Sequence, residues 1–131
     1  MKSIFATVAF AAICAFAGSA GAADQFKADS DKIHADYKAA MDLCKPMKGN
    51  AKDICKVEAK GNRDVAKAEL EAKKEPNARH EAKVKHEKAE AAYKLAKEKC
   101  EDMKGKEMVT CKKDARMAYS SAKSEAKTTK M

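Results

Sequence analysis

Two stretches of this 131-residue chain decide its fold. Residues 44–55 read CKPMKGNAKDIC and residues 100–111 read CEDMKGKEMVTC, so a cysteine closes each end and ten residues lie between the two. Both stretches have glycine near the centre, and glycine is the residue that most readily adopts the left-handed backbone found just past a helix end. Each stretch therefore predicts the tip of a helical hairpin.

The tips also predict a disulfide pairing, because the cysteines of each stretch are equidistant from the turn and would lie at the same height on facing helices. The predicted disulfide and turn residues are Cys44, Cys55, Gly49 and Asn50 in the first tip, and Cys100, Cys111 and Gly105 in the second. Crossed pairing between the hairpins and a four-cysteine zinc site are the alternatives. Zinc sites usually have two to four residues between paired cysteines, which disfavours zinc here.

The two stretches belong to an internal repeat. Sliding the chain along itself until Cys44 falls on Cys100 aligns further positions on both sides of the cysteines without a gap. The matches include Tyr37/Tyr93, Ala40/Ala96, Met47/Met103, Ala59/Ala115, Ala66/Ala122 and Glu69/Glu125. Alanine and lysine could match by composition alone, but the cysteines and glycines could not, so we interpret the pattern as a duplication.

Within each unit the apolar residues recur with helical spacing. In the first helix they are Phe26, Ile33, Tyr37, Met41 and Cys44. A spacing of three, four or seven residues is typical of an amphipathic helix. We further expect the side chain of Asn50 to cap the helix that follows the first tip, with Asp53 three residues later.

The boundary between the two units is predicted at Pro76 and Asn77, because proline ends a helix and asparagine can begin one. We expect an all-α fold of two tandem disulfide-stapled helical hairpins, at residues 23–77 and 78–131. The four helices would form an up-down-up-down bundle or an elongated pair. One long helix kinked at Pro76 is the alternative, and residues 124–131 are predicted to form a frayed tail.

Residues 1–22 have the features of a signal peptide. Lys2 precedes an apolar run, residues 4–17, that is short for a bilayer span, and residues 18–22 are small. We expect cleavage after Ala22 and export to the periplasm, with no transmembrane segment left afterwards. The mature chain, residues 23–131, would carry a formal charge of +7, because the removed segment holds one lysine and no acid while the whole chain carries +8.

Two alternatives concern this leader. An uncleaved membrane anchor is disfavoured because no cluster of charges stops the apolar run. Lipidation of Cys14 is disfavoured by the bulky Ile13 before it. Removal of Cys14 also leaves an even number of cysteines, as expected for an exported disulfide protein.

Composition predicts a thin core. Leu, Ile, Val and Phe supply only ten of the residues after Ala22, a level that together with the net charge is typical of disorder. Alanine, lysine and glutamate are good helix formers, however, and an oxidising compartment permits stabilising cross-links. We therefore expect order that depends on the disulfides.

No catalytic or cofactor motif is present: there is no phosphate-binding glycine loop, nucleophile elbow or Cys-His pair, so we predict neither an enzyme nor a cofactor. His34, His80 and His86 lack the spacing of a ligand set and are predicted to be surface residues. Met47 and Met103 beside the glycines could bind copper through their thioether sulfurs, but we favour a packing role over the hairpin tips.

The basic excess suggests attachment to an anionic envelope surface through a salt-sensitive charge effect. Positive and negative residues are nevertheless interleaved along the chain, as in residues 83–88, which favours solvated helix faces with local ion pairs. Nucleic acid is disfavoured as a partner, because the tyrosines fall on the apolar stripes and leave no aromatic residues for base stacking.

The segment from Tyr37 through the tip MKGNAKDIC at residues 47–55 to Leu70 resembles a family of small secreted proteobacterial proteins. These proteins carry a duplicated Cys-x10-Cys unit and are often labelled TolA-like or cell envelope biogenesis proteins. The resemblance covers nearly all of the chain after the leader, and the second tip departs from it at residues 106–110. It implies residence in the cell envelope and supplies no active-site residues.

Together these features lead us to expect a non-enzymatic structural or adaptor protein of the periplasm, which binds an envelope protein, an anionic envelope surface or a second copy of itself. The alternatives are a periplasmic holdase chaperone or stress protein, and a protein that buffers copper or zinc.

Overall fold

A computed structural model describes residues 20–129 of the chain, with side chains from residue 21. Four helices make up this part: α1 (Ala20–Cys44), α2 (Gly49–Lys74), α3 (Ala78–Cys100) and α4 (Gly105–Thr128). The prediction of an all-α fold with two helical hairpins is confirmed. The predicted signal peptide, residues 1–22, lies outside the described residues except for its last three, which begin α1.

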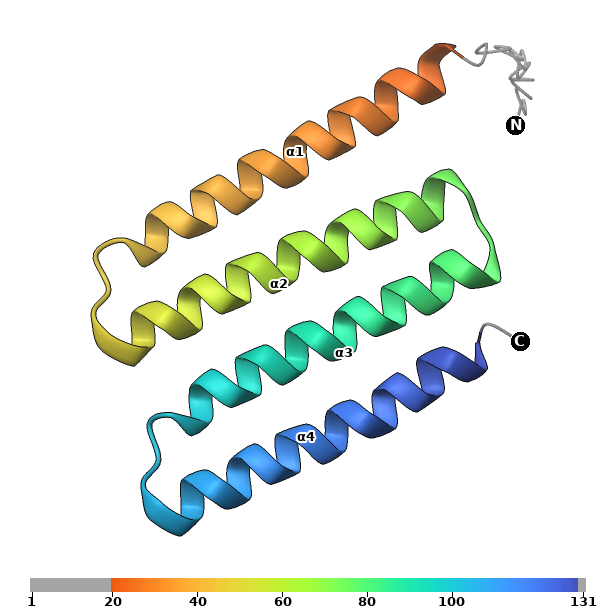
Figure 1. Cartoon of the computed structure of the whole chain (residues 1–131). Helices are drawn as coiled ribbons and strands as arrows, with labels where there is room; N and C mark the ends of the chain where they lie inside the picture. The colour runs from red at the N-terminus through yellow and green to blue at the C-terminus, as the bar shows by residue number, and fades with distance from the viewer. Residues whose placement is uncertain (1–19, 130–131) are drawn as a thin grey trace, which may run out of the picture.

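The four helices lie side by side in one layer, each antiparallel to its neighbour (Figure 1). Contacts join α1 to α2, α2 to α3 and α3 to α4, whereas α1 and α4, over the ranges given above, do not touch. The chain therefore runs up, down, up and down as expected, but it forms an open row and not a closed bundle. Small residues explain this, because a bundle needs large apolar side chains to fill its centre.

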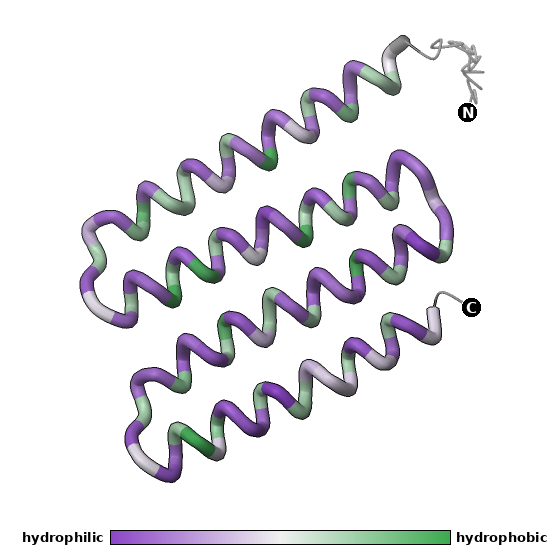
Figure 2. Tube along the Cα trace, in the orientation of Figure 1, coloured by the Kyte–Doolittle hydropathy of each residue, from purple (hydrophilic) through white to green (hydrophobic). Residues whose placement is uncertain are grey.

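Each helix is built from residues with high helix propensity, and ion pairs one turn apart support α1 and α3. Lys32 contacts Asp36 at 2.6 Å on α1, and Glu90 contacts Lys94 in the same way on α3. Such exposed pairs stabilise a helix by only about 0.3–0.5 kcal/mol each. Hydrophilic residues predominate in all four helices. Figure 2 shows short apolar segments placed singly along each helix between hydrophilic ones.

The predicted turn glycines adopt the left-handed conformation, with φ of 59° at Gly49 and 58° at Gly105. The prediction that Asn50 caps α2 is wrong. The N-cap is Lys48, which makes no side-chain cap, and Asn50 lies inside the first turn of α2. Its Nδ2 donates to the carbonyl oxygen of Glu98 at 2.8 Å, so Asn50 ties the two hairpins together instead.

The turn between the hairpins lies where Pro76 predicted it. Helix α2 ends at Lys74, and Asn77 caps α3 by accepting a hydrogen bond from the backbone N–H of His80 at 2.9 Å. The alternative of one long kinked helix is therefore wrong, because the chain reverses direction at this turn.

The predicted frayed tail is wrong for most of its length. Helix α4 continues to Thr128, and Ala126 within it is buried. Contact with α3 holds the end of α4 in place. In addition, the side chain of Lys85 on α3 donates a hydrogen bond to the hydroxyl of Thr129 at 2.8 Å. Tertiary contact thus overrides the polar composition of the segment.

The buried residues confirm a thin core, because all that the structure describes are alanine or cysteine. They are Cys44, Ala59, Ala68, Ala82, Ala89, Cys100, Ala115 and Ala126. Small side chains let neighbouring helices approach closely, but each removes little apolar area from water, so packing contributes modestly.

Gly61 of α2 lies at a close approach to α3. A Cβ atom added to this glycine would meet the Cβ of Ala91 on α3 at 2.9 Å, which is too short for two carbon atoms. The absence of a side chain at Gly61 therefore lets α2 and α3 come this close at Ala91.

Both predicted disulfides are present. Cys44 is bonded to Cys55 with a Cα–Cα distance of 5.6 Å, and Cys100 to Cys111 with 5.7 Å. Crossed pairing is therefore excluded, and no cysteine thiolate of the two tips is left for zinc. Each bond joins the two helices of one hairpin near its tip.

Removing either disulfide should destabilise the protein by about 3 kcal/mol, because each closes a short loop in the unfolded chain. The pairs Cys44→Ala with Cys55→Ala, and Cys100→Ala with Cys111→Ala, avoid burying a hydroxyl at these positions. Urea unfolding followed by far-ultraviolet circular dichroism measures the loss, with reduced wild-type protein as the control. A loss below about 0.5 kcal/mol would contradict the predicted role.

Substitution of Gly61 by Ala should lower the melting temperature, although in an open helix the same change would stabilise it by about 1 kcal/mol. The added methyl group collides with Ala91, so the effect should reverse in an Ala91→Gly background. A double-mutant cycle by thermal unfolding checks this. Equal effects of Gly61→Ala in both backgrounds would show that the two residues are not in contact.

Candidate functional site

The groove between α3 and α4 gathers positive charge. It is a cavity of about 510 Å³, within the usual range of ligand sites, near the start of α3 and the end of α4. Its lining, which we call the basic groove, is Arg79, His80, Ala82, Lys83, His86, Lys123, Ala126 and Lys127. The lining includes no aspartate or glutamate, although carboxylates are interleaved with these residues in the sequence.

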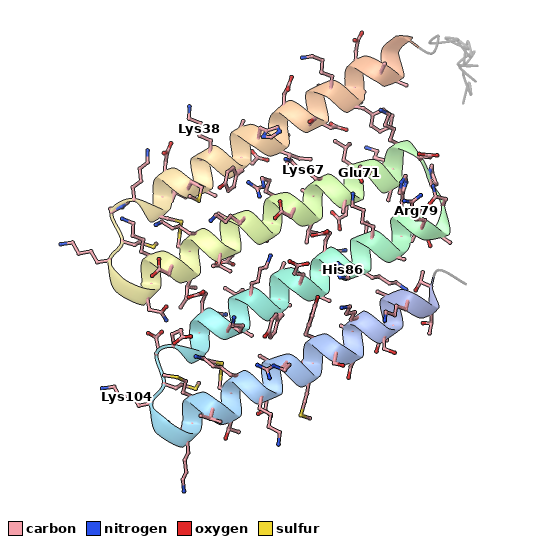
Figure 3. All side chains as sticks on the ribbon, in the orientation of Figure 1. Lys38, Lys67, Glu71, Arg79, His86 and Lys104 are labelled. Atoms are coloured by element: carbon pink, nitrogen blue, oxygen red, sulfur yellow. A yellow bond between two sulfur atoms is a disulfide. The ribbon has the colours of Figure 1, made fainter. Side chains whose placement is uncertain are left out.

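Helical periodicity separates the charges that the linear sequence mixes. Arg79 and Lys83 are four residues apart on α3, and Lys123 and Lys127 are four apart on α4, so each pair shares one helix face. Nearby acids such as Glu81 occupy other phases of the same turns and are absent from the lining. Figure 3 shows Arg79 near the start of α3 and His86 further along the same helix.

Two alanines form the bottom of the groove. Ala82 and Ala126 are each 4 % exposed and lie where α3 and α4 pack together. Their small side chains leave the space above them open, whereas a large apolar residue at either position would fill it. The same residues thus allow close helix packing and create the cavity.

The cations of the groove differ in how they are paired. Lys83 forms an ion pair with Glu71 of α2, and its hydrogen bond lowers the pKa of the Glu71 carboxyl. Among the residues that the structure describes, Arg79, Lys123 and Lys127 form no ion pair. Three positive charges of the groove are therefore uncompensated by a carboxylate in this part of the chain.

The two histidines of the groove are half-buried and held in place, whereas His34 is exposed as predicted. The Nδ1 atom of His80 lies 2.7 Å from the carbonyl oxygen of Glu75. Because a carbonyl oxygen can only accept, Nδ1 donates and the other ring nitrogen, Nε2, remains free of this bond. The ring of His86 packs edge-on against Tyr119, with 6.5 Å between centroids.

The tyrosines pack against one another and against cations. Tyr93 and Tyr119 stack with their ring centroids 4.9 Å apart, and the ammonium of Lys123 lies 5.8 Å from the Tyr119 ring. On the other hairpin, the guanidinium of Arg63 lies 4.4 Å from the ring of Tyr37. These contacts were not predicted from sequence, because they join residues on different helices or depend on which face each residue occupies.

A second cavity, of about 350 Å³, lies between α2 and α3 and is lined by both positive and negative side chains. Its lining includes Lys60, Arg63 and Lys94 together with Asp64, Glu87 and Glu90. A hydrogen bond from Lys94 lowers the pKa of Glu90, and the same bond raises the pKa of Lys94. Cations here are matched by acids, which distinguishes this cavity from the basic groove.

The predicted site residues lie at the other end of the layer. The two tips, with their disulfides and turn glycines, are opposite the α2–α3 turn, and Lys104 marks that end in Figure 3. Met47 and Met103 are exposed there. Within residues 20–129 no three histidine, cysteine or acidic side chains are grouped to hold a metal ion. The disulfide sites and the basic groove are therefore separate features.

None of the helices in the described part of the chain is both long and apolar enough to cross a membrane. Comparison of the chain with protein-family models, with curated proteins and with solved structures found no match.

Proposed function

We propose that this protein is a non-enzymatic structural or adaptor protein of the bacterial cell envelope, exported to the periplasm through a signal peptide, residues 1–22, that is then cleaved. The observation that carries the proposal is the open layer of stapled helices. Because each helix contacts only its neighbours in the row, no other helix of residues 20–129 covers either broad face of the layer, and a partner can bind there.

Disulfides in both hairpins support the location. Disulfides form and persist in oxidising compartments such as the periplasm and are rare in the cytosol. This agrees with the leader predicted from sequence and with the resemblance to envelope proteins.

The character of the surface supports a binding role over catalysis. Catalytic acids and bases are usually titratable groups that burial has perturbed. Within the described residues no polar or charged side chain is buried, and the shifted pKa values belong to largely exposed ion pairs. A surface of this kind binds partners through charge and shape, and the basic groove offers attachment to an anionic envelope component.

Photo-crosslinking in the native periplasm tests the role. A photoreactive amino acid replaces Leu43, Val109 or Met117, which are 71 %, 67 % and 57 % exposed and whose substitution should not disturb the fold. We expect discrete adducts with an envelope protein, an envelope lipid or a second copy of the chain.

A variant with all four tip cysteines replaced by alanine, carrying the same photoreactive residue, provides the control. It should lose these adducts, because the layer depends on the staples. An uncrosslinked monomer at all three positions, or recovery of the protein from the cytoplasm, would contradict the proposed function.

A further inference from the structure

We propose that the basic groove between α3 and α4 binds phosphate groups, and that its ligand carries more than one of them. This inference rests on the proposed envelope role for its setting, and it adds the chemical class of the anion. It is carried by the two facing rows of cations and by the space between them.

The arrangement of charge favours a multivalent anion. Arg79, Lys123 and Lys127 have no carboxylate partner within the described residues, and Lys83 shares its charge with Glu71. Cations that line one groove repel each other, so an anion bound among them relieves a cost already present in the free protein. A single carboxylate would offset one such charge, whereas a polyphosphate offsets several.

The donor chemistry fits phosphate. The guanidinium of Arg79 can donate two parallel hydrogen bonds to one phosphate, and lysine ammonium groups bind phosphate as point charges. His80 supplies no donor to the groove, because its Nδ1 donates to the carbonyl oxygen of Glu75 and Nε2 of the neutral ring can then only accept.

The length of the groove sets the size of the ligand. From Arg79 to His86 the α3 side extends about 10 Å, at about 1.5 Å per residue. One phosphate does not span that length, but a chain or pair of phosphate groups does. The aromatic rings of the lining are those of His80 and His86, which are held by Glu75 and Tyr119, and Tyr93 and Tyr119 stack on each other. The groove therefore suits phosphate groups rather than nucleic acid bases.

Inorganic tripolyphosphate is the probe for the first experiment, with the oxidised exported protein titrated calorimetrically at low salt. The test variant is Lys123→Gln with Lys127→Gln. The matched control is Lys104→Gln with Lys106→Gln, two exposed lysines at the opposite end of α4 whose removal changes net charge equally. We expect the groove variant to bind at least tenfold more weakly and the control to stay within twofold of wild type.

Amide chemical shifts provide a second readout on the same samples. Tripolyphosphate should shift the signals of residues 79–86 and 123–127 most, and binding should weaken as salt rises. Absence of wild-type binding, an equal loss in both variants, or shifts spread evenly over the four helices would overturn the proposal. None of these results bears on the proposed envelope role, which the crosslinking experiment tests separately. A failure of phosphate binding can therefore be distinguished from a failure of the envelope role.

Vesicles separate the two sources of phosphate. Phosphatidylglycerol in phosphatidylcholine vesicles presents anionic lipid phosphates side by side. Pure phosphatidylcholine vesicles are the control, because the choline of each headgroup neutralises its phosphate. Binding to the anionic vesicles that tripolyphosphate displaces, and that the groove variant loses, assigns a lipid headgroup. Binding of tripolyphosphate without binding of vesicles assigns a soluble polyphosphate, and both results uphold the groove as the phosphate site.

Discussion

The rest of the structure depends on two covalent links, one across each hairpin. Helix contacts in this protein are made largely by alanine, and a buried methyl group contributes only about 0.8 kcal/mol. Fixing the backbone of one residue costs about 1–2 kcal/mol, so contacts this small leave little surplus. The bonds Cys44–Cys55 and Cys100–Cys111 reduce the entropy of the unfolded chain and so favour the folded hairpins.

The same small residues determine the shape and through it the surface. Without large apolar side chains there is no centre for four helices to surround, and the hairpins lie beside each other in a row (Figure 1). In a row, every helix exposes residues on the two broad faces of the layer. Charged residues three or four positions apart then lie together on one of these faces. The basic groove is one result: alanines at its bottom bring α3 and α4 together, and cations one turn apart face each other above them.

The fold could largely be predicted from sequence, because its determinants are local. Cysteines placed symmetrically about a glycine, the internal repeat and Pro76 are each visible without a structure. The errors involve long-range contact: Asn50 bonds to α3 instead of capping its own helix, and α3 holds the predicted tail in helix. The basic groove was missed because its residues alternate with acids along the chain. Plotting charge by helical phase would have revealed each row, but only the structure shows that the rows face each other.

The most direct measurement of the role assigned to the disulfides is peptide mapping of the natively exported protein, by mass spectrometry without reduction. The predicted result is two linked pairs of peptides, one joining Cys44 to Cys55 and the other joining Cys100 to Cys111. Free thiols at these positions, or peptides linked between the two hairpins, would contradict it, because the helical layer would then lack the bonds that hold it together.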